Sequence, residues 1–220
     1  MIISKKHKFI VLNAPKTGSG FREDQLRPFI DISNDTVNED IRHLKAEEAF
    51  TYCRKNNLDP NEFYWVAFAR NPWTRVESFF NQVANEILDE EKHSPRYGTV
   101  PKEELFSPGF LLKFVQNQRE TRHRYPLGPQ SEYYIKPNGK DFDFIGQLET
   151  MQEGIDHILS KFNLNHKIQS HEQHFVSKFG ETREKSSHHQ EVKKLWREDS
   201  IEIIRNLEQK TIEKFNYVHT

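Results

Sequence analysis

The sequence predicts an α/β protein with a central, mainly parallel β-sheet flanked by helices. Two runs rich in apolar, β-branched and aromatic residues, 8–12 and 63–69, have the length and composition of buried strands. Each is followed by segments with helical spacing of apolar residues, and a third short apolar run occupies 142–146. Strands that alternate with helices indicate a parallel sheet, because a parallel pair needs a crossover connection.

The size and charge of the chain limit what it can bind. Its 220 residues suit one α/β domain, which we predict to span 1–220. Lysine and arginine total 32 against 33 aspartates and glutamates, so the formal net charge is −1. A nearly neutral molecule has no overall electrostatic field that would attract nucleic acid or an anionic membrane, and we expect neither as a partner. Any anion site must therefore be local.

Cysteine use and hydropathy favour a cytoplasmic location. The single cysteine, Cys53, excludes an intramolecular disulfide and fits a reducing compartment. No apolar run approaches the roughly 20 residues that cross a bilayer. Residues 1–16 carry charges inside what would be the apolar part of a signal peptide, so we interpret this segment as the first strand.

The first half of the chain alternates strands and helices, separated by Pro, Gly and Asn residues typical of turns. Asn71-Pro72 opens the last helix of this half, since proline is tolerated in a first turn. The expected elements are a strand at 8–12, helices at 21–29 and 44–56, a strand at 63–69 and a helix at 71–88.

The second half is less regular. Ser107-Pro108 forms a cap and first-turn pair for a helix that ends at Gln118. Thr150-Met151-Gln152-Glu153 has the capping-box pattern and opens a helix to Phe162. The remaining expected elements are loops at 89–107, 119–130 and 165–190, a strand at 142–146 and a helix at 191–216.

The loop after the first strand carries the first of two anion signals. It reads Lys16-Thr17-Gly18-Ser19-Gly20. The backbone N–H groups of a glycine-rich turn and of a helix N-terminus bind anions, and the lysine and hydroxyls would add donors. A Walker A loop differs, because its lysine comes last and enters the helix. An ordinary Gly-Ser turn with a solvated lysine is the competing interpretation.

The second anion signal lies where the second buried strand meets a helix. It reads Arg70-Asn71-Pro72-Trp73-Thr74-Arg75-Val76-Glu77-Ser78. Arg70 is placed for a bidentate grip on a phosphate, and Ser78 would need a ligand that lies along the helix. The alternative is a structural ion pair for Arg70 and a surface position for Ser78. Ligands of parallel sheets bind at the carboxyl ends of strands, so two phosphate sites there suit a nucleotide with anions at both ends.

These motifs resemble those of sulfotransferases that use PAPS (3′-phosphoadenosine 5′-phosphosulfate), in particular the branch that sulfates carbohydrates. Members have a P-K-T-x-[GS]-[ST] loop, a helix preceded by His-Leu and a strand that ends in R-[ND]-P-[WY]-x-R-x-x-S. The resemblance covers nearly the whole chain. The matching segments are Pro15-Lys16-Thr17-Gly18-Ser19, Arg42-His43-Leu44-Lys45-Ala46, 70–78, Pro129-Gln130-Ser131, 143–149 and 201–217.

The resemblance implies a P-loop NTPase-like sulfotransferase fold and a role for each motif. The loop at 16–20 would bind the 5′-phosphosulfate of PAPS, and Arg70 and Ser78 its 3′-phosphate. A late loop that closes over the nucleotide in relatives corresponds to Lys185 and Ser186. The chain departs from the family pattern twice: Gln147 stands in place of an arginine, and Glu184 in place of an asparagine.

The acceptor hydroxyl needs a base, and two residues compete for that role beside the catalytic Lys16. The ordinary pKa of a histidine, about 6.5, suits proton transfer. His43 also matches the histidine that acts as base in uronic-acid 2-O-sulfotransferases, which this branch resembles. Glu23 lies one helical turn after the loop, near a glutamate that another branch uses. The structural alternatives are a capping role for His43 and a helix-dipole role for Glu23.

We expect no metal, because the eleven histidines form no zinc-binding pattern, even in their densest group of His171, His174, His188 and His189. The resemblance implies in-line transfer to a hydroxyl of a saccharide or glycan-like acceptor. Two other functions stay open. One is a P-loop kinase of a small molecule, which needs Mg²⁺ ligands, and the other is a non-catalytic nucleotide- or glycan-binding module. The sequence gives no indication of an oligomeric state.

Overall fold

The chain divides into two compact units. A computed structural model describes residues 1–88, 100–116, 127–170, 173 and 189–219. The first unit consists of Met1–Arg70 and Gln130–Gly180, and the second of Asn71–Pro129 and Glu181–Thr220. No helix in these described ranges is long and apolar enough to cross a membrane.

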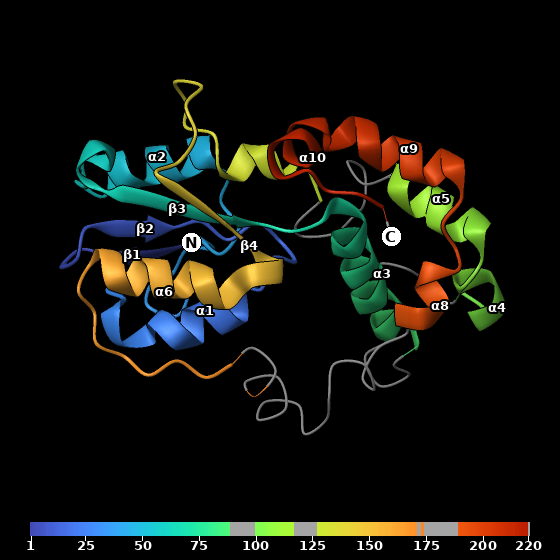
Figure 1. The fold of residues 1–220 in the computed structure, drawn as a ribbon, viewed down its shortest axis with the longest axis horizontal. Coiled ribbons are helices and arrows are strands. Elements are labelled where there is room, and N and C mark those ends of the chain that lie inside the picture. The colour runs from blue at the N-terminus through green and yellow to red at the C-terminus, as the bar shows by residue number, and fades with distance from the viewer. Residues whose placement is uncertain (89–99, 117–126, 171–172, 174–188, 220) are drawn as a thin grey trace. The chain divides into compact units, whose positions relative to one another are not determined.

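The first unit is built on a four-stranded sheet (Figure 1). Its strands, in spatial order, are β1 (Ile2–Ser4), β2 (Phe9–Val11), β3 (Tyr64–Ala69) and β4 (Phe144–Gln147). The β2–β3 and β3–β4 pairs are parallel, with Ile10 opposite Trp65 and Phe68 opposite Gly146, and the β1–β2 pair is antiparallel. The predicted α/β class with a mainly parallel sheet is therefore confirmed.

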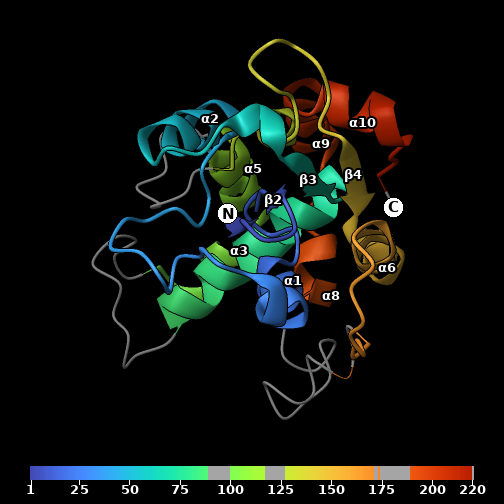
Figure 2. The same cartoon turned by 90° about the vertical axis from the view of Figure 1, so that its left-hand side faces the viewer.

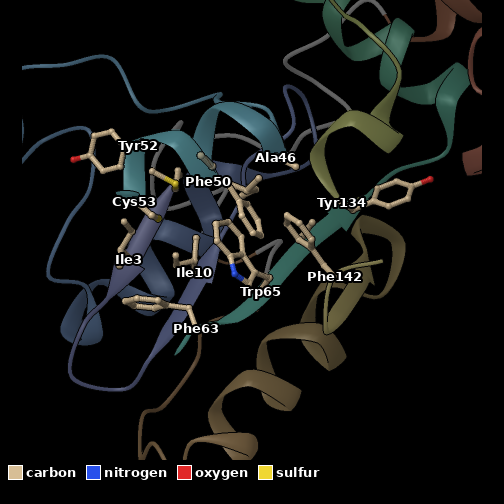
Figure 3. Packing of buried hydrophobic residues seen from close by; sticks show 14 of the residues in the cluster. Ile3, Ile10, Ala46, Phe50, Tyr52, Cys53, Phe63, Trp65, Tyr134 and Phe142 are labelled. Carbon is tan, nitrogen blue, oxygen red and sulfur yellow. The ribbon is translucent and has the colours of Figure 1, made fainter. Parts of the chain in front are cut away.

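Helices cover both faces of this sheet (Figures 1 and 2). They are α1 (Ser19–Leu26), α2 (Ala46–Lys55) and α6 (Met151–Lys161). Side chains alternate along a strand, so neighbouring residues pack into different clusters. Trp65 packs beneath α2, where its ring stacks on Phe50 with centroids 4.3 Å apart (Figure 3). Val66 and Phe68 pack in the opposite cluster with Phe21 of α1 and Ile155 of α6.

The N-terminal segment is a hairpin, so our prediction of a single strand over 1–16 was wrong. β1 and β2 are joined by a turn at 5–8, in which Lys8 has a φ of 57°. Lys5, Lys6 and His7 are consecutive polar residues that a buried strand does not accommodate, and the chain reverses there. The antiparallel β1 consequently covers the edge of β2.

The described part of the second unit is helical. Its elements are α3 (Pro72–Leu88), α4 (Lys102–Leu105), α5 (Pro108–Gln116), α8 (His189–Lys193), α9 (Glu198–Leu207) and α10 (Gln209–Phe215). Phe79 and Phe80 of α3 pack on Phe114 of α5, with ring centroids 5.4 and 5.3 Å apart. Arg75 of α3 forms a buried ion pair with Glu208 at 2.6 Å.

Most predicted helices are confirmed. The helices predicted at 21–29, 44–56 and 71–88 correspond to α1 with a one-turn 3₁₀ helix η1 (Arg27–Phe29), to α2 and to α3. The helix predicted from Ser107 corresponds to α5 over its described residues. The Oγ of Ser107 accepts the Phe110 amide at 3.1 Å, as the predicted capping role requires. Residues 89–99, 117–126 and most of the predicted loop at 165–190 lie outside the described residues.

Three local predictions were wrong. The predicted loop at 89–107 contains α4. Thr150 makes no side-chain capping bond, because the 3₁₀ turn η4 (Leu148–Thr150) leads directly into α6. The single helix predicted at 191–216 is divided into α8, α9 and α10. A new helix starts after Arg197, whose amide donates to Ser200 Oγ at 3.1 Å.

Gly154 of α6 provides a test of the packing between this helix and the sheet. A Cβ at this position would lie 2.9 Å from Phe68 Cζ, whereas a Cβ at Gly109 of α5 would meet only Ser107 Oγ at 4.0 Å. We predict that Gly154→Ala destabilises the protein by about 1–3 kcal/mol, although alanine is the better helix former by about 1 kcal/mol.

The matched control is Gly109→Ala, which should stabilise by about 0.4–1 kcal/mol. Urea denaturation followed by circular dichroism measures both variants. Equal changes in the free energy of unfolding for Gly154→Ala and Gly109→Ala would contradict the close packing of α6 on Phe68.

Candidate active site

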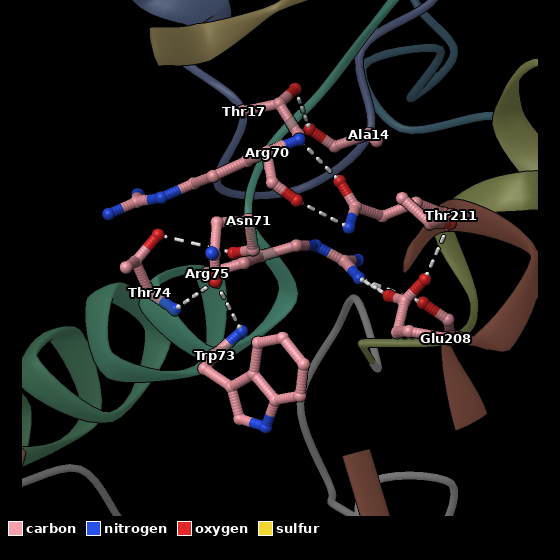
Figure 4. Close-up of polar contacts among 11 residues, drawn as sticks. Ala14, Thr17, Arg70, Asn71, Trp73, Thr74, Arg75, Glu208 and Thr211 are labelled. Atoms are coloured by element: carbon pink, nitrogen blue, oxygen red, sulfur yellow. Dashed lines mark hydrogen bonds and ion pairs between the residues drawn. The ribbon is translucent and has the colours of Figure 1, made fainter. Parts of the chain in front are cut away.

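The β2–α1 loop, residues 12–18, lies at the carboxyl end of β2. Two of its residues are in the left-handed region, Lys16 with a φ of 66° and Gly18 with a φ of 80°. Such a conformation is uncommon for a non-glycine residue and costs of order 1–3 kcal/mol, so it clusters at binding sites. Thr17 between them is buried, and its Oγ1 donates to Ala14 O at 2.8 Å (Figure 4). A turn of this kind at the start of a helix is suited to binding an anion.

Gly18 is required in this loop for two reasons. Its φ is one that L side chains rarely adopt. In addition, a Cβ at this position would lie 2.8 Å from Leu148 Cδ1 and 2.9 Å from Met151 Cε. The backbone of the loop is therefore pressed against η4 and the start of α6.

Arg22, in the first turns of α1, holds the loop from the interior. It is 0% exposed. Its Nη1 donates to Thr17 O, its Nη2 donates to Asn13 Oδ1 at 2.9 Å, and the guanidinium lies 4.5 Å from the centroid of the Phe68 ring. Burial lowers the pKa of Arg22 to about 9, and the nearby carboxylate of Glu23 opposes that shift. The arginine remains charged at neutral pH and its donors fix the loop.

Arg70, the first residue after β3, reaches the same loop. Its Nη1 donates to Lys16 O at 3.2 Å. Its backbone is fixed by the side chain of Gln130, whose Oε1 accepts the Arg70 amide and whose Nε2 donates to the Arg70 carbonyl, both at 2.9 Å (Figure 4). The two predicted anion motifs thus contact each other at the carboxyl ends of β2 and β3.

His43 lies on the segment that precedes α2, and its Nδ1 is 2.7 Å from the backbone oxygen of Asn13. A carbonyl oxygen only accepts, so Nδ1 carries the hydrogen and Nε2 the lone pair of the neutral ring. Burial lowers the pKa of His43 to about 4, and the bond to Asn13 opposes that shift. The ring is neutral at pH 7, in the tautomer whose Nε2 can accept a proton.

Glu23 also contacts Asn13. Its Oε1 accepts from Asn13 Nδ2 at 2.7 Å. The two predicted candidates for the base, His43 and Glu23, are therefore both bonded to Asn13, the second residue of the β2–α1 loop. Sequence reasoning treated them as independent alternatives.

The other predicted site residues have different positions. Ser19 and Gly20 form the first turn of α1, with Ser19 half-buried and Gly20 exposed. Ser78 is half-buried on α3 in the second unit. Lys185 and Ser186 lie outside the described residues. Gln147, which replaces a family arginine, is the last residue of β4 and pairs with Ala69.

The segment that follows Arg70 is fixed within the second unit. The Oδ1 of Asn71 accepts the amides of Trp73 and Thr74 at 3.1 and 3.4 Å and so caps α3 (Figure 4). Its Nδ2 donates to Val218 O at 2.8 Å. One turn later, the Arg75–Glu208 pair is extended by Thr211 Oγ1, which donates to Glu208 at 2.9 Å.

The histidine cluster considered for a metal falls largely outside the described residues, with His171, His174 and His188 among those not described. Within the described ranges, no group of three histidine, cysteine or carboxylate residues is placed to hold a metal ion.

Sequence reasoning missed Asn13, Arg22 and Gln130. Arg22 was hidden in a charged stretch that looked like a solvent-exposed helix face. Its spacing was the available signal, because Arg22 lies four residues before the buried Leu26 and so shares the buried face of α1. Asn13 was a polar residue directly after a buried apolar run, and Gln130 was part of a matching motif without an assigned role.

Comparison with known proteins identifies the family. A family model described as sulfotransferase family matches residues 1–218. The chain belongs to the sulfotransferase family. No curated protein and no solved structure matched the chain.

Membership confirms the resemblance seen in the motifs at the level of the family. It supports sulfuryl transfer to a hydroxyl-bearing acceptor, and sulfotransferases of this family generally use PAPS as donor. In this sulfotransferase, left-handed Lys16 and Gly18, the start of α1 and the Arg70 guanidinium lie together at the β2–α1 loop, an arrangement suited to an anion.

The lowered pKa of His43 generates a prediction about acid stability. The native pKa of about 4 lies below the unfolded value of 6.5, so between these pH values the unfolded chain binds a proton that the native protein does not. Stability is therefore lost as pH falls through this window. In His43→Asn, whose amide can still donate to the Asn13 carbonyl, this loss between pH 7.5 and pH 5 should be smaller by on the order of 1 kcal/mol.

Urea denaturation of wild type and His43→Asn at the two pH values measures the difference. A variant that loses as much stability as the wild type would show that His43 titrates with an ordinary pKa.

Proposed function

We propose that this sulfotransferase moves a sulfuryl group from PAPS to a hydroxyl of a carbohydrate-like acceptor, as one functional domain that spans 1–220. The observation that carries the proposal is the contact between Arg70 Nη1 and Lys16 O at 3.2 Å, because it joins the two phosphate motifs. A 3′-phosphate and a 5′-phosphosulfate on one ribose present two anions only a few ångströms apart. An arginine that reaches the β2–α1 loop suits such a ligand.

The donor would be held by residues of both motifs. Lys16, Thr17, Gly18, Ser19 and Gly20 would bind the 5′-phosphosulfate through backbone N–H groups, hydroxyls and the lysine charge. Arg70 would bind the 3′-phosphate. On the sequence pattern alone, we also propose Ser78, Lys185 and Ser186 as donor ligands.

The proposed chemistry is an in-line displacement at sulfur. The acceptor oxygen forms a bond to sulfur while the bond between sulfur and the 5′-phosphate oxygen breaks, and the products are a sulfate ester and 3′,5′-ADP. The acceptor proton passes to His43 Nε2. Lys16 would offset the negative charge that develops on the leaving phosphate, so most of the rate enhancement would come from positioning and charge stabilisation.

His43 is supported over Glu23 as the base by its hydrogen bonding. Its ring is neutral and its Nδ1 hydrogen is committed to Asn13, which leaves Nε2 as the proton acceptor. The carboxylate of Glu23 accepts a hydrogen bond from Asn13 Nδ2, which suits an orienting role for Asn13.

A small-molecule kinase and a non-catalytic nucleotide- or glycan-binding module are the alternative functions. The lysine precedes the glycines of the loop, whereas the Walker A loop of a kinase places it after them, at the helix start. This order favours the sulfotransferase over the kinase.

Lys16 provides the test of catalysis. We predict that Lys16→Ala lowers transfer of sulfuryl from PAPS to a panel of saccharides by about 100-fold or more, because the leaving group loses its counter-charge. Stability should change little, since alanine meets the same left-handed backbone. Lys8→Ala is the matched control, because Lys8 is also a lysine with positive φ, and its ammonium contacts Glu62 in an exposed pair and the Phe63 ring, away from the β2–α1 loop.

Release of 3′,5′-ADP and formation of the sulfated saccharide are measured together by chromatography. Lys16→Ala with wild-type turnover would remove Lys16 from the catalytic machinery. Wild-type protein that phosphorylates the panel from ATP and Mg²⁺, but does not consume PAPS, would be a kinase.

Arg70 provides the test of donor recognition. We predict that Arg70→Ala weakens binding of 3′,5′-ADP by about 10- to 100-fold, the usual worth of hydrogen bonds to a charged group. Binding of 5′-AMP, which lacks the 3′-phosphate, should weaken much less. The exposed Arg54 on α2 provides the control variant Arg54→Ala.

Dissociation constants from calorimetric titration decide the outcome. A variant that loses affinity equally for both nucleotides would show that Arg70 shapes the loop and does not bind the 3′-phosphate.

A further inference from the structure

Asn13 makes three separate polar contacts at the end of β2 and is 0% exposed. Its backbone oxygen accepts from His43 Nδ1 at 2.7 Å, its Oδ1 accepts from Arg22 Nη2 at 2.9 Å, and its Nδ2 donates to Glu23 Oε1 at 2.7 Å. A buried asparagine with all of these groups engaged has one available orientation.

The chemistry of its neighbours fixes that orientation. A guanidinium has only donors and a carboxylate has only acceptors, so the oxygen of the Asn13 amide must face Arg22 and its nitrogen must face Glu23. A rotated amide would place its NH₂ group against the guanidinium and its oxygen against the carboxylate. Arg22 is held in turn by Thr17, because Nη1 donates to the Thr17 carbonyl and Nη2 lies 3.3 Å from Thr17 Oγ1.

The same residue sets the tautomer of His43. The acceptor for Nδ1 is a backbone carbonyl, which every substitution of the Asn13 side chain retains, but the bond forms only if that backbone holds the carbonyl against the ring. The side-chain contacts to Arg22 and Glu23 hold the backbone in place. The Nε2 lone pair of His43 is thus positioned by a network that also fixes the carbonyl of Thr17 in the β2–α1 loop.

We infer that Asn13 is a positioning residue that couples the proposed base, His43, to the phosphate-binding loop. This inference rests on the proposed function. Asn13 is the only side chain among the described residues that bonds to both Arg22 and Glu23. A shift of the loop would move the Asn13 carbonyl and, with it, the ring of His43.

A single and a double variant test the inference by changing the hydrogen bond between residues 13 and 23. Asn13→Asp keeps the shape and the acceptor for Arg22 but places a carboxylate oxygen against Glu23 Oε1. In the double variant Asn13→Asp/Glu23→Gln, the new amide can donate to that oxygen, which restores a bonded pair with donor and acceptor exchanged. A purely space-filling role for Asn13 would not distinguish the two variants.

The expected result is a split between turnover and donor affinity. Asn13→Asp should lower kcat by about 100-fold, since displacement of a reacting group by about 1 Å has an effect of that size, and should change the dissociation constant of 3′,5′-ADP by less than about threefold. The double variant should recover at least about tenfold in kcat over the single variant. A double variant no better than Asn13→Asp, or an Asn13→Asp variant with wild-type kcat, contradicts the inference.

The tautomer of His43 provides a readout that needs no substrate. In ¹⁵N NMR spectra, wild type and the double variant should show the ring protonated at Nδ1, and Asn13→Asp should show a shift toward the Nε2-protonated form. Wild-type His43 protonated at Nε2 overturns the inference, whether or not Asn13→Asp folds. Wild-type protein that has the expected tautomer but neither binds 3′,5′-ADP nor consumes PAPS overturns the proposed function and leaves the network intact.

Discussion

The buried guanidinium of Arg22 is the interaction on which the rest of the candidate site depends. A charge removed from water is costly unless acceptors surround it, and both Nη atoms of Arg22 obtain acceptors from Asn13 and Thr17, while the guanidinium also faces the Phe68 ring. The buried Nε of Arg22 has no hydrogen-bond partner among the described residues. Those acceptors belong to the loop that carries Lys16 and Gly18 in left-handed conformations. The cation thus stabilises a strained turn from the inside, and the outer side of that turn is the proposed position of the donor.

The sequence was sufficient to predict the scaffold because short-range patterns determine it. The apolar runs at 8–12 and 63–69 and the Pro72 that opens α3 each act within a few residues. The hairpin of β1 and β2, the division of the last helix and the missing capping bond of Thr150 were not predicted. The division of the last helix accompanies a contact between distant segments, because Trp196 is buried and donates to Glu77. The other two are local features that the apolar pattern does not reveal, the pairing of Ile3 with Ile10 across a short turn and the 3₁₀ turn that leads into α6.

The candidate site likewise combines residues that the motifs predict with contacts that only the structure reveals. Lys16, Arg70, His43 and Glu23 were identified from their motifs, but the motifs do not reveal that Arg70 contacts the carbonyl of Lys16 or that His43 and Glu23 share Asn13. These bonds link positions up to 54 residues apart. They exist because parallel strands bring their carboxyl ends to one edge of the sheet, which the fold class predicts without naming the partners.

We propose that the contact between Arg70 and the β2–α1 loop forms a site for a nucleotide with a 3′-phosphate and a 5′-anion. The most direct measurement is calorimetric titration of the wild-type protein with 3′,5′-ADP, with 5′-AMP and with ATP plus Mg²⁺. We predict that 3′,5′-ADP binds at least about tenfold more tightly than either of the others, since hydrogen bonds to the second phosphate are charge-assisted. Equal affinity for 3′,5′-ADP and 5′-AMP, no binding of either, or a preference for ATP would contradict it.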